Sequence, residues 1–240
     1  GKHCSVCGTV TKAQEVVKAT GHSFTEGKCG ICGAEDPDYV KPTEPEVKGV
    51  TRVFGADRYT TAFKAADTLK AELGVSKFQN VIVASGTGFA DALAGSYLAA
   101  MKQAPILLVR GANVNDVKNY IKANLASGGT VYLLGGVNAV PKAMETGLDG
   151  FNVKRLGGAN RYDTNLLILQ EAGVGDKDII VCTGLNFADS LSASATGLPI
   201  LLVDSNKSLS AAQKAYLAAH SDSAYTILGG TAAVSEKMAS

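Results

Sequence analysis

The sequence is 240 residues long and 46% hydrophobic, and its 23 basic and 22 acidic residues leave a formal net charge of +1. A chain of this length can bury more than one core. Its nearly neutral balance provides no broad field for a nucleic acid or a membrane surface, so an anionic partner would have to be held by a few well-placed charges. The most apolar run, YLAAMKQAPILLV, is interrupted by two polar residues and a proline, and we therefore expect no membrane-spanning helix.

The first part of the chain contains two C-x-x-C pairs, each followed by a glycine. Their spacing is close to that of a zinc ribbon, in which four thiolates hold one tetrahedral zinc ion. We therefore predict a zinc-ribbon-like segment over residues 1–36, with structural zinc as its cofactor. Two disulfides in an oxidising compartment, or a site that uses His3 or His22, are the alternatives. The predicted metal ligands are Cys4, Cys7, Cys29 and Cys32.

A stretch with three prolines and alternating charges, EDPDYVKPTEPEVK, follows the cysteines. This composition predicts an extended linker, which we place at residues 37–50.

Beyond the linker, four motifs occur twice in the same order. They are RVFGADRYTTA and RLGGANRYDTN, SGTGFADALAG and TGLNFADSLSA, APILLV and LPILLV, and VYLLGGVNAV and YTILGGTAAV. This recurrence indicates two copies of one structural unit, which we place at residues 51–154 and 155–240. The second copy has no counterpart of NVKRL (152–156), so we expect that the natural protein continues or that this strand is supplied in another way.

Within each copy, short unbroken apolar runs alternate with stretches of helical period. Runs such as 81–84, 106–109 and 131–134 show no in–out alternation, which is typical of strands buried on both faces. Regular alternation of such strands with helices predicts an α/β fold of the doubly wound class, with one open parallel sheet per copy. Two expected helices bury the sets Tyr59, Ala62, Phe63, Ala66 and Leu69, and Val117, Tyr120, Ile121 and Leu125.

Two aspartates, Asp91 and Asp189, occupy matching places in the repeat. Gly88 and Asn186 precede the two FAD motifs and are acceptable N-caps, which would make the aspartates the third residues of helices. A carboxylate at that position complements the helix dipole.

Two arginines also occupy matching places, directly after the candidate N-caps Asp57 and Asn160. As first residues of helices, these cations oppose the dipole, so each needs a negative group nearby. That group would be the aspartate of the same copy or an anionic ligand at the carboxyl ends of the strands, where open α/β sheets usually bind ligands. The candidate ligand-binding residues are therefore Arg58, Asp91, Arg161 and Asp189.

Glycines follow the expected strands, which indicates turns with positive φ or a close approach of the backbone to an anion. No G-x-G-x-x-G precedes a helix and no phosphate-loop lysine is present, so we expect no nucleotide cofactor. The glycines are Gly86, Gly135, Gly136, Gly184, Gly229 and Gly230.

Catalytic arrangements are scarce in this sequence. His220 is the only histidine beyond the linker and has no nucleophile at a recognisable spacing. Ser85 is replaced by Thr183 in the second copy, which argues against a serine nucleophile. Cys182 lies in the strand-like run DIIVCTG and is expected to be an inert buried thiol. We predict no catalytic residue and no enzyme activity.

The four repeated motifs resemble the cell wall binding repeat 2 modules of secreted Gram-positive surface proteins, over residues 51–240. The resemblance implies flavodoxin-like or Toprim-like modules that pack in a trimer-like group, within or between chains. It also implies a non-catalytic anchor, secreted to the cell wall, that binds an anionic wall polymer without a covalent bond. On this reading the partners include no nucleic acid and no membrane.

Two other classes of function are alternatives. A hydrolase of wall glycan would need a pair of carboxylates about 5–10 Å apart, and Asp57 with Asp91 is the pair to consider. A nucleic-acid module built on the cysteine segment would need clustered Lys and Arg, but Glu15 and Glu26 dilute its lysines.

Overall fold

The computed structural model describes residues 2–12, 21, 24–39 and 49–236. The chain divides into two compact units, residues 1–51 and residues 52–240. Most of the predicted linker, residues 40–48, lies outside the described residues.

The N-terminal unit contains two short antiparallel pairs of strands. β1 (Lys2–His3) pairs with β2 (Val10–Lys12), and β3 (Phe24–Thr25) pairs with β4 (Lys28–Cys29). Among the described residues of this unit, Cys29 is the only buried apolar side chain, whereas Val6 and Ile31 are more than 90% exposed. The described part of this unit therefore has no apolar core of its own.

The first α/β module contains a four-stranded sheet in the order β6-β5-β7-β8, and every neighbouring pair is parallel. In chain order the strands lie as second, first, third and fourth, which is the flavodoxin-like arrangement of the doubly wound class. Its elements are α1 (Arg58–Glu72), β5 (Phe78–Ser85), α2 (Ala90–Lys102), β6 (Ile106–Val109), α3 (Val114–Asn124), β7 (Leu125–Leu134) and β8 (Asn152–Leu156), with 3₁₀ turns at Gly111–Asn113 and Lys142–Glu145.

The second module repeats this arrangement with three described strands, in the order β10-β9-β11. Both pairs are parallel, and β9 takes the central place that β5 has in the first sheet. The predicted α/β class with parallel sheets is therefore confirmed. Its elements are α4 (Arg161–Ala172), β9 (Ile179–Thr183), α5 (Ala188–Ser194), β10 (Ile200–Val203), α6 (Ala211–Ala219) and β11 (Tyr225–Ile227).

One helix expectation was wrong at its end. Leu125 was assigned to the same helix face as Val117 and Ile121, but α3 ends at Asn124 and Leu125 begins β7 with extended backbone angles. Its side chain is nevertheless fully buried in the same cluster as the other two. The apolar pattern reflects burial, and the buried face continues from α3 into β7. The pattern alone therefore does not show where the helix ends and the strand begins.

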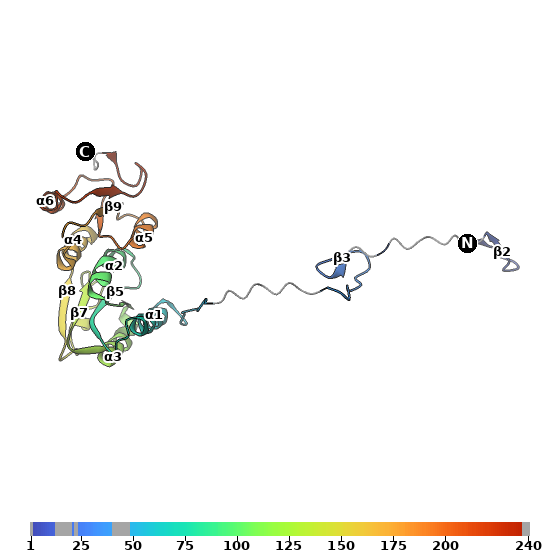
Figure 1. Ribbon diagram of the computed structural model, residues 1–240, viewed down its shortest axis with the longest axis horizontal. Coiled ribbons are helices and arrows are strands. Elements are labelled where there is room, and N and C mark those ends of the chain that lie inside the picture. The colour runs from blue at the N-terminus through green and yellow to red at the C-terminus, as the bar shows by residue number, and fades with distance from the viewer. Residues whose placement is uncertain (1, 13–20, 22–23, 40–48, 237–240) are drawn as a thin grey trace. The chain divides into compact units, whose positions relative to one another are not determined.

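The two modules share a core. One cluster of buried side chains includes Ile82 and Tyr97 of the first module and Ile168 and Ile180 of the second. Helix α2 lies between the first sheet and α4, as Figure 1 shows, and α2 contacts both α4 and α5. A second cluster, on the other face of the first sheet, is enclosed by α1 and α3. Residues 52–236 therefore form one packed body, in which the two modules are not independent.

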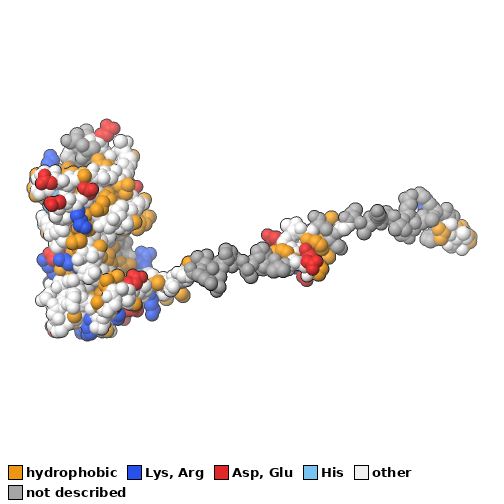
Figure 2. Space-filling model, in the orientation of Figure 1, with side chains coloured by type: hydrophobic (Ala, Val, Ile, Leu, Met, Phe, Trp, Pro, Cys, Tyr) orange, Lys and Arg blue, Asp and Glu red, His pale blue; other side chains and the backbone are white. Residues whose placement is uncertain are grey.

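No helix within the described ranges is long and apolar enough to cross a membrane. Figure 2 shows that charged side chains of both signs are scattered over the displayed face of residues 52–236 and do not gather into one large patch. A surface of this kind agrees with the near-zero net charge and leaves recognition to local sites.

Candidate functional site

The first helix of each module begins as expected. Asp57 caps α1: its carboxylate accepts from the backbone amide of Thr60 at 2.8 Å, and the Thr60 hydroxyl accepts from the Asp57 amide at 3.0 Å. Asn160 caps α4 by accepting from the amides of Tyr162 and Asp163. The two arginines are therefore the first helical residues, which confirms that prediction.

Each arginine is held by the loop after the central strand of its own module. One Nη of Arg58 donates to the Gly86 carbonyl at 2.8 Å, and Arg161 donates in the same way to the Gly184 carbonyl. These carbonyls supply part of the negative charge that a cation at a helix start requires. The expected ion pairs within each copy are absent, because no salt bridge among the described residues joins Arg58 to Asp91 or Arg161 to Asp189.

The glycine whose carbonyl accepts the arginine's hydrogen bond also contacts a tyrosine ring, that of the residue directly after the arginine. A Cβ at Gly86 would lie 2.2 Å from the Tyr59 ring, and one at Gly184 would lie 2.6 Å from the Tyr162 ring. Neither glycine has positive φ. The expectation of turn geometry was therefore wrong here, and the glycine is required because an aromatic ring occupies the space of a side chain.

The FAD helices begin one residue later than expected. Phe89 and Phe187 are the N-caps of α2 and α5, without a side-chain cap, so each aspartate is the second helical residue and not the third. In the first module the Ser85 hydroxyl accepts from the amides of Thr87 and Gly88 at 3.2 and 3.3 Å. Gly88 is therefore part of a turn organised by Ser85, which is why it does not cap the helix.

Both aspartates lie against a glycine with positive φ at the end of the third strand. A Cβ at Gly135 (φ 102°) would lie 2.5 Å from Asp91 Oδ2, and one at Gly229 (φ 127°) would lie 2.8 Å from Asp189 Oδ2. The matching positions of aspartate and glycine in the two copies are thus explained by contact: the carboxylate fits only because the glycine has no side chain.

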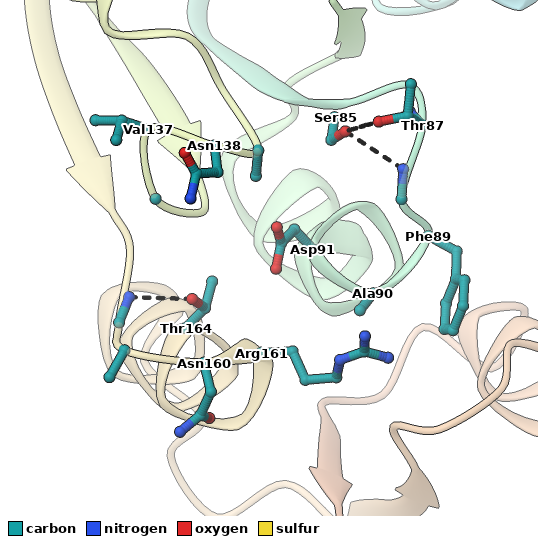
Figure 3. Close-up of a pocket in the computed structure, with 15 residues that line it drawn as sticks. Ser85, Thr87, Phe89, Ala90, Asp91, Val137, Asn138, Asn160, Arg161 and Thr164 are labelled. Carbon is teal, nitrogen blue, oxygen red and sulfur yellow. Dashed lines mark hydrogen bonds between the residues drawn. The ribbon is translucent and has the colours of Figure 1, made fainter.

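The structure brings Asp91 together with the arginine of the other module. An inter-module cleft of about 740 Å³ opens between the loops after β5 and β7 and the start of α4, and both Asp91 and Arg161 line it. Figure 3 shows the Asp91 carboxylate at the centre of this cleft, with the Arg161 side chain entering from the second module beside Phe89. The guanidinium carbon lies 5.7 Å from the Phe89 ring centroid. Thr87, Asn138 and Asn160 add polar groups to the lining.

The electrostatics of the cleft are not those of a closed ion pair. Burial raises the pKa of Asp91, and the charge of Arg161 offsets this only in part. Within the described ranges, no residue donates a hydrogen bond to the Asp91 carboxylate or forms an ion pair with it. Arg161 is exposed and uses one donor on Gly184. A partly buried acceptor and an exposed cation with spare donors therefore face the same space.

Asp91→Asn is expected to raise the thermal midpoint of unfolding at pH 7. A carboxyl whose pKa is raised by folding costs stability when it is ionised, and this cost disappears as the pH falls through the raised pKa. The gain should therefore shrink between pH 7 and pH 4, which calorimetry at a series of pH values can measure. A lower midpoint at pH 7 would show that Asp91 has a stabilising partner, as the sequence interpretation assumed.

Arg58 lies in different surroundings. It lines an adjoining apolar groove of about 460 Å³ with Leu93, Phe187 and Leu191, and this groove shares Thr87 and Phe89 with the inter-module cleft. Asp189 lines neither the inter-module cleft nor this groove. Of the four predicted ligand-binding residues, the structure thus brings one aspartate and one arginine into a shared cleft and leaves the other two outside it.

The remaining candidates for chemistry are accounted for by local structure. Cys182 is fully buried in β9, and burial raises its pKa to about 11, so it is a poor nucleophile. His220 ends α6, with its Nδ1 2.8 Å from the Tyr216 carbonyl. No three His, Cys, Asp or Glu side chains among the described residues form a metal-binding group. His22 lies outside the described residues, and so does the side chain of His3.

Sequence reasoning found the charged residues of the cleft but missed Phe89, Thr87 and Asn138 as its walls. The repeated FAD motif held the signal for Phe89, since an apolar residue directly before a helix start that recurs in both copies needs a reason. Nothing in the sequence pointed to Asn138, because its counterpart in the second copy, Ala232, is apolar.

The fold and the site define a class: tandem parallel α/β modules fused through one core, with a polar cleft between them at the carboxyl ends of the strands. The model of the family Cell wall binding domain 2 (CWB2) matches residues 52–145 and 155–239. The chain belongs to this family, as the repeated motifs predicted. Family membership makes it a secreted, wall-associated protein with tandem wall-binding modules.

Two known proteins with similar sequences are from Bacillus subtilis (strain 168). The chain is 27% identical over 201 residues to N-acetylmuramoyl-L-alanine amidase LytC, a match that covers 81% of this chain and 39% of that protein. It is 32% identical over 177 residues to the amidase enhancer, covering 70% of this chain and 24% of that protein. The chain thus spans well under half the length of each relative.

Two solved structures from Clostridium difficile have the same fold. Cwp8 superposes with a TM-score of 0.66 at 28% identity, over 77% of this chain and 32% of that chain. Cwp6 gives 0.65 at 22% identity, over 82% and 33% of the two chains.

Proposed function

We propose that this chain is a non-catalytic anchor that binds an anionic secondary polymer of the cell wall in the inter-module cleft. The observation that carries the proposal is the meeting of Arg161 and Asp91 across the junction of the two modules, in an open cleft, without an ion pair between them. Family membership supports wall binding, and the cleft supports this particular place and chemistry.

The cleft suits a polymer that carries both a negative charge and hydroxyl groups. Arg161 has donors left for a phosphate or carboxylate after its bond to Gly184, and an exposed guanidinium binds such groups in a bidentate way. The Asp91 carboxylate is an acceptor for sugar hydroxyls. The Phe89 ring forms an apolar wall against which the face of a sugar can lie. A wall polymer of charged sugar units would use all three.

The surroundings of the aspartates favour binding over hydrolysis. Asp91 is the single carboxylate among the described residues that line the cleft, whereas glycoside hydrolysis normally uses two. Asp57, the other carboxylate considered, caps α1, lies 3.9 Å from Arg110, and has its pKa lowered by hydrogen bonding to Thr60. A carboxyl held ionised in a cap cannot serve as a general acid. The amidase named among the relatives is matched over 39% of its length, which fits a shared wall-binding part.

Retention on purified walls tests the proposal. The whole chain is expected to sediment with walls of Clostridium difficile or Bacillus subtilis, and to lose retention when the anionic polymer is stripped with acid. Because the recognising cation is exposed, retention should also fall as salt is raised to about 1 M, where charges are screened within about 3 Å. Equal retention on stripped and intact walls would place binding on peptidoglycan and overturn the proposal.

The family resemblance implied that modules pack together in a trimer-like group, and the second module has an exposed apolar surface for such a contact. Phe89 of the first module is in contact with Phe187, with ring centroids 5.8 Å apart, and lies near Arg161. Phe187 and Leu191 of the second module are more than half exposed. We propose that this exposed surface receives the first helix of another module, within a longer chain or from another copy. If the chain sedimented as a monomer at all concentrations, the other module would not come from a second copy of this chain.

A further inference from the structure

The C-x-x-C pair near the start of the chain forms a tight turn, which we call the first cysteine turn (residues 4–9). The Cys4 amide donates to the Thr9 carbonyl at 2.8 Å, and the Gly8 amide donates back to the Cys4 carbonyl at 3.0 Å. Gly8 has φ of 70°, a conformation that only glycine adopts without strain. The two strands β1 and β2 lead into and out of this turn.

The second pair forms the same turn, the second cysteine turn (residues 29–34). The Cys29 amide donates to the Ala34 carbonyl at 2.8 Å, and the Gly33 amide donates to the Cys29 carbonyl at 2.9 Å. Gly33 has φ of 72°, within two degrees of its counterpart. The glycine after each pair is therefore explained by the turn, and the two turns are equivalent in backbone geometry.

The unit that contains these turns has little else to hold it together. Its described strands are two or three residues long, and its described apolar side chains other than Cys29 are exposed or partly exposed. A segment of this size without an apolar core requires a metal or disulfides to stay folded. Two equivalent C-x-x-C turns supply four thiolates, the donor set that tetrahedral zinc prefers.

We propose that the first and second cysteine turns together bind one zinc ion through Cys4, Cys7, Cys29 and Cys32, and that this ion stabilises the described segments around them, residues 2–12 and 24–39. The turns are joined by residues 13–23, most of which lie outside the described residues, so each turn is known by its own geometry. Each turn is a two-thiolate half-site, and neither half-site alone completes four-coordinate zinc. Each thiol gives up its proton to solvent when its sulfur binds the ion.

Cobalt(II) titration of the whole chain tests this inference. The protein is purified under reducing conditions, stripped of metal with a chelator, and titrated with Co²⁺, which absorbs visibly in tetrahedral thiolate sites. We expect saturation at one equivalent per chain, with strong thiolate-to-cobalt absorption that added Zn²⁺ removes. Cys7→Ser and Cys32→Ser, one from each turn, should each weaken binding by at least about 100-fold.

Cys182→Ala is the matched control, since this fifth cysteine is buried in the second sheet and should leave the titration unchanged. A second measurement, hydrogen exchange, should show that chelation unfolds residues 2–12 and 24–39 while residues 52–236 keep their protection. Two equivalents of Co²⁺, or an effect of Cys7→Ser without one of Cys32→Ser, would overturn the single shared site. Absence of stoichiometric binding by the reduced chain would overturn the metal itself and favour disulfides. None of these readouts depends on wall binding.

Discussion

Ile168→Ala is expected to destabilise both modules at once, by about 2–5 kcal/mol. Ile168 lies in α4, is fully buried, and belongs to the cluster that also contains Ile82 of the first sheet and Ile180 of the second. Removal of most of its side chain leaves a cavity at the junction, where α2 packs on α4. Urea unfolding should therefore remain a single transition with a lower midpoint. Hydrogen exchange should quicken in β5 as well as in β9.

Leu167→Ala is the matched control for this change. Leu167 is the neighbouring residue on the same helix, but its side chain is 38% exposed and lies outside the shared cluster. Its replacement should cost clearly less than that of Ile168, because a partly exposed site leaves little cavity. If Ile168→Ala instead gave two separate transitions, with β5 still protected after β9 had opened, the modules would be independent bodies and the shared core would carry no coupling.

The core that the two modules share limits how much of the fold could be predicted from the sequence. The repeat and the apolar runs identified the strands, and the caps Asp57 and Asn160 identified where α1 and α4 begin. Periodicity shows that a helix has an apolar face, but it does not show which helix covers that face. The contact of α2 with α4 could therefore not be predicted, although the family resemblance implied that modules pack together. A single module expressed alone would lose the neighbours that α2 has in the second module, among them Lys177, which lies over the Tyr97 ring.

The candidate site was predictable in its residues and not in its pairing. Asp91, Asp189 and the two arginines were identified because they recur in both copies at helix starts. The nearest charged partner within one copy was the simplest choice. The structure instead brings Asp91 into the same cleft as the arginine of the following module, because α4 packs on α2. A contact between repeats cannot be deduced by comparing the repeats with each other.

Charge reversal at the cleft is expected to have the largest effect on function. Arg161→Glu removes the proposed ligand of the polymer's anionic groups and places a second carboxylate near Asp91. Loss of a charge-assisted hydrogen bond, together with new repulsion, should reduce wall retention by roughly 10- to 100-fold or more. Retention is measured as the wall concentration that sediments half of the chain.

Arg58→Glu separates this effect from a general loss of structure. Both arginines begin a helix and donate to the carbonyl of a glycine in their own module, so the two variants lose the same local contact. They should therefore show similar decreases in thermal midpoint. Only Arg161 lines the inter-module cleft, whereas Arg58 lines the apolar groove. Retention of the Arg58→Glu protein should accordingly stay within about threefold of the parent, a change of less than about 1 kcal/mol.

Equal losses of wall retention in both variants would trace the effect to the structural contact that the two arginines share. Full retention of the folded Arg161→Glu protein would show that the inter-module cleft is not the polymer site.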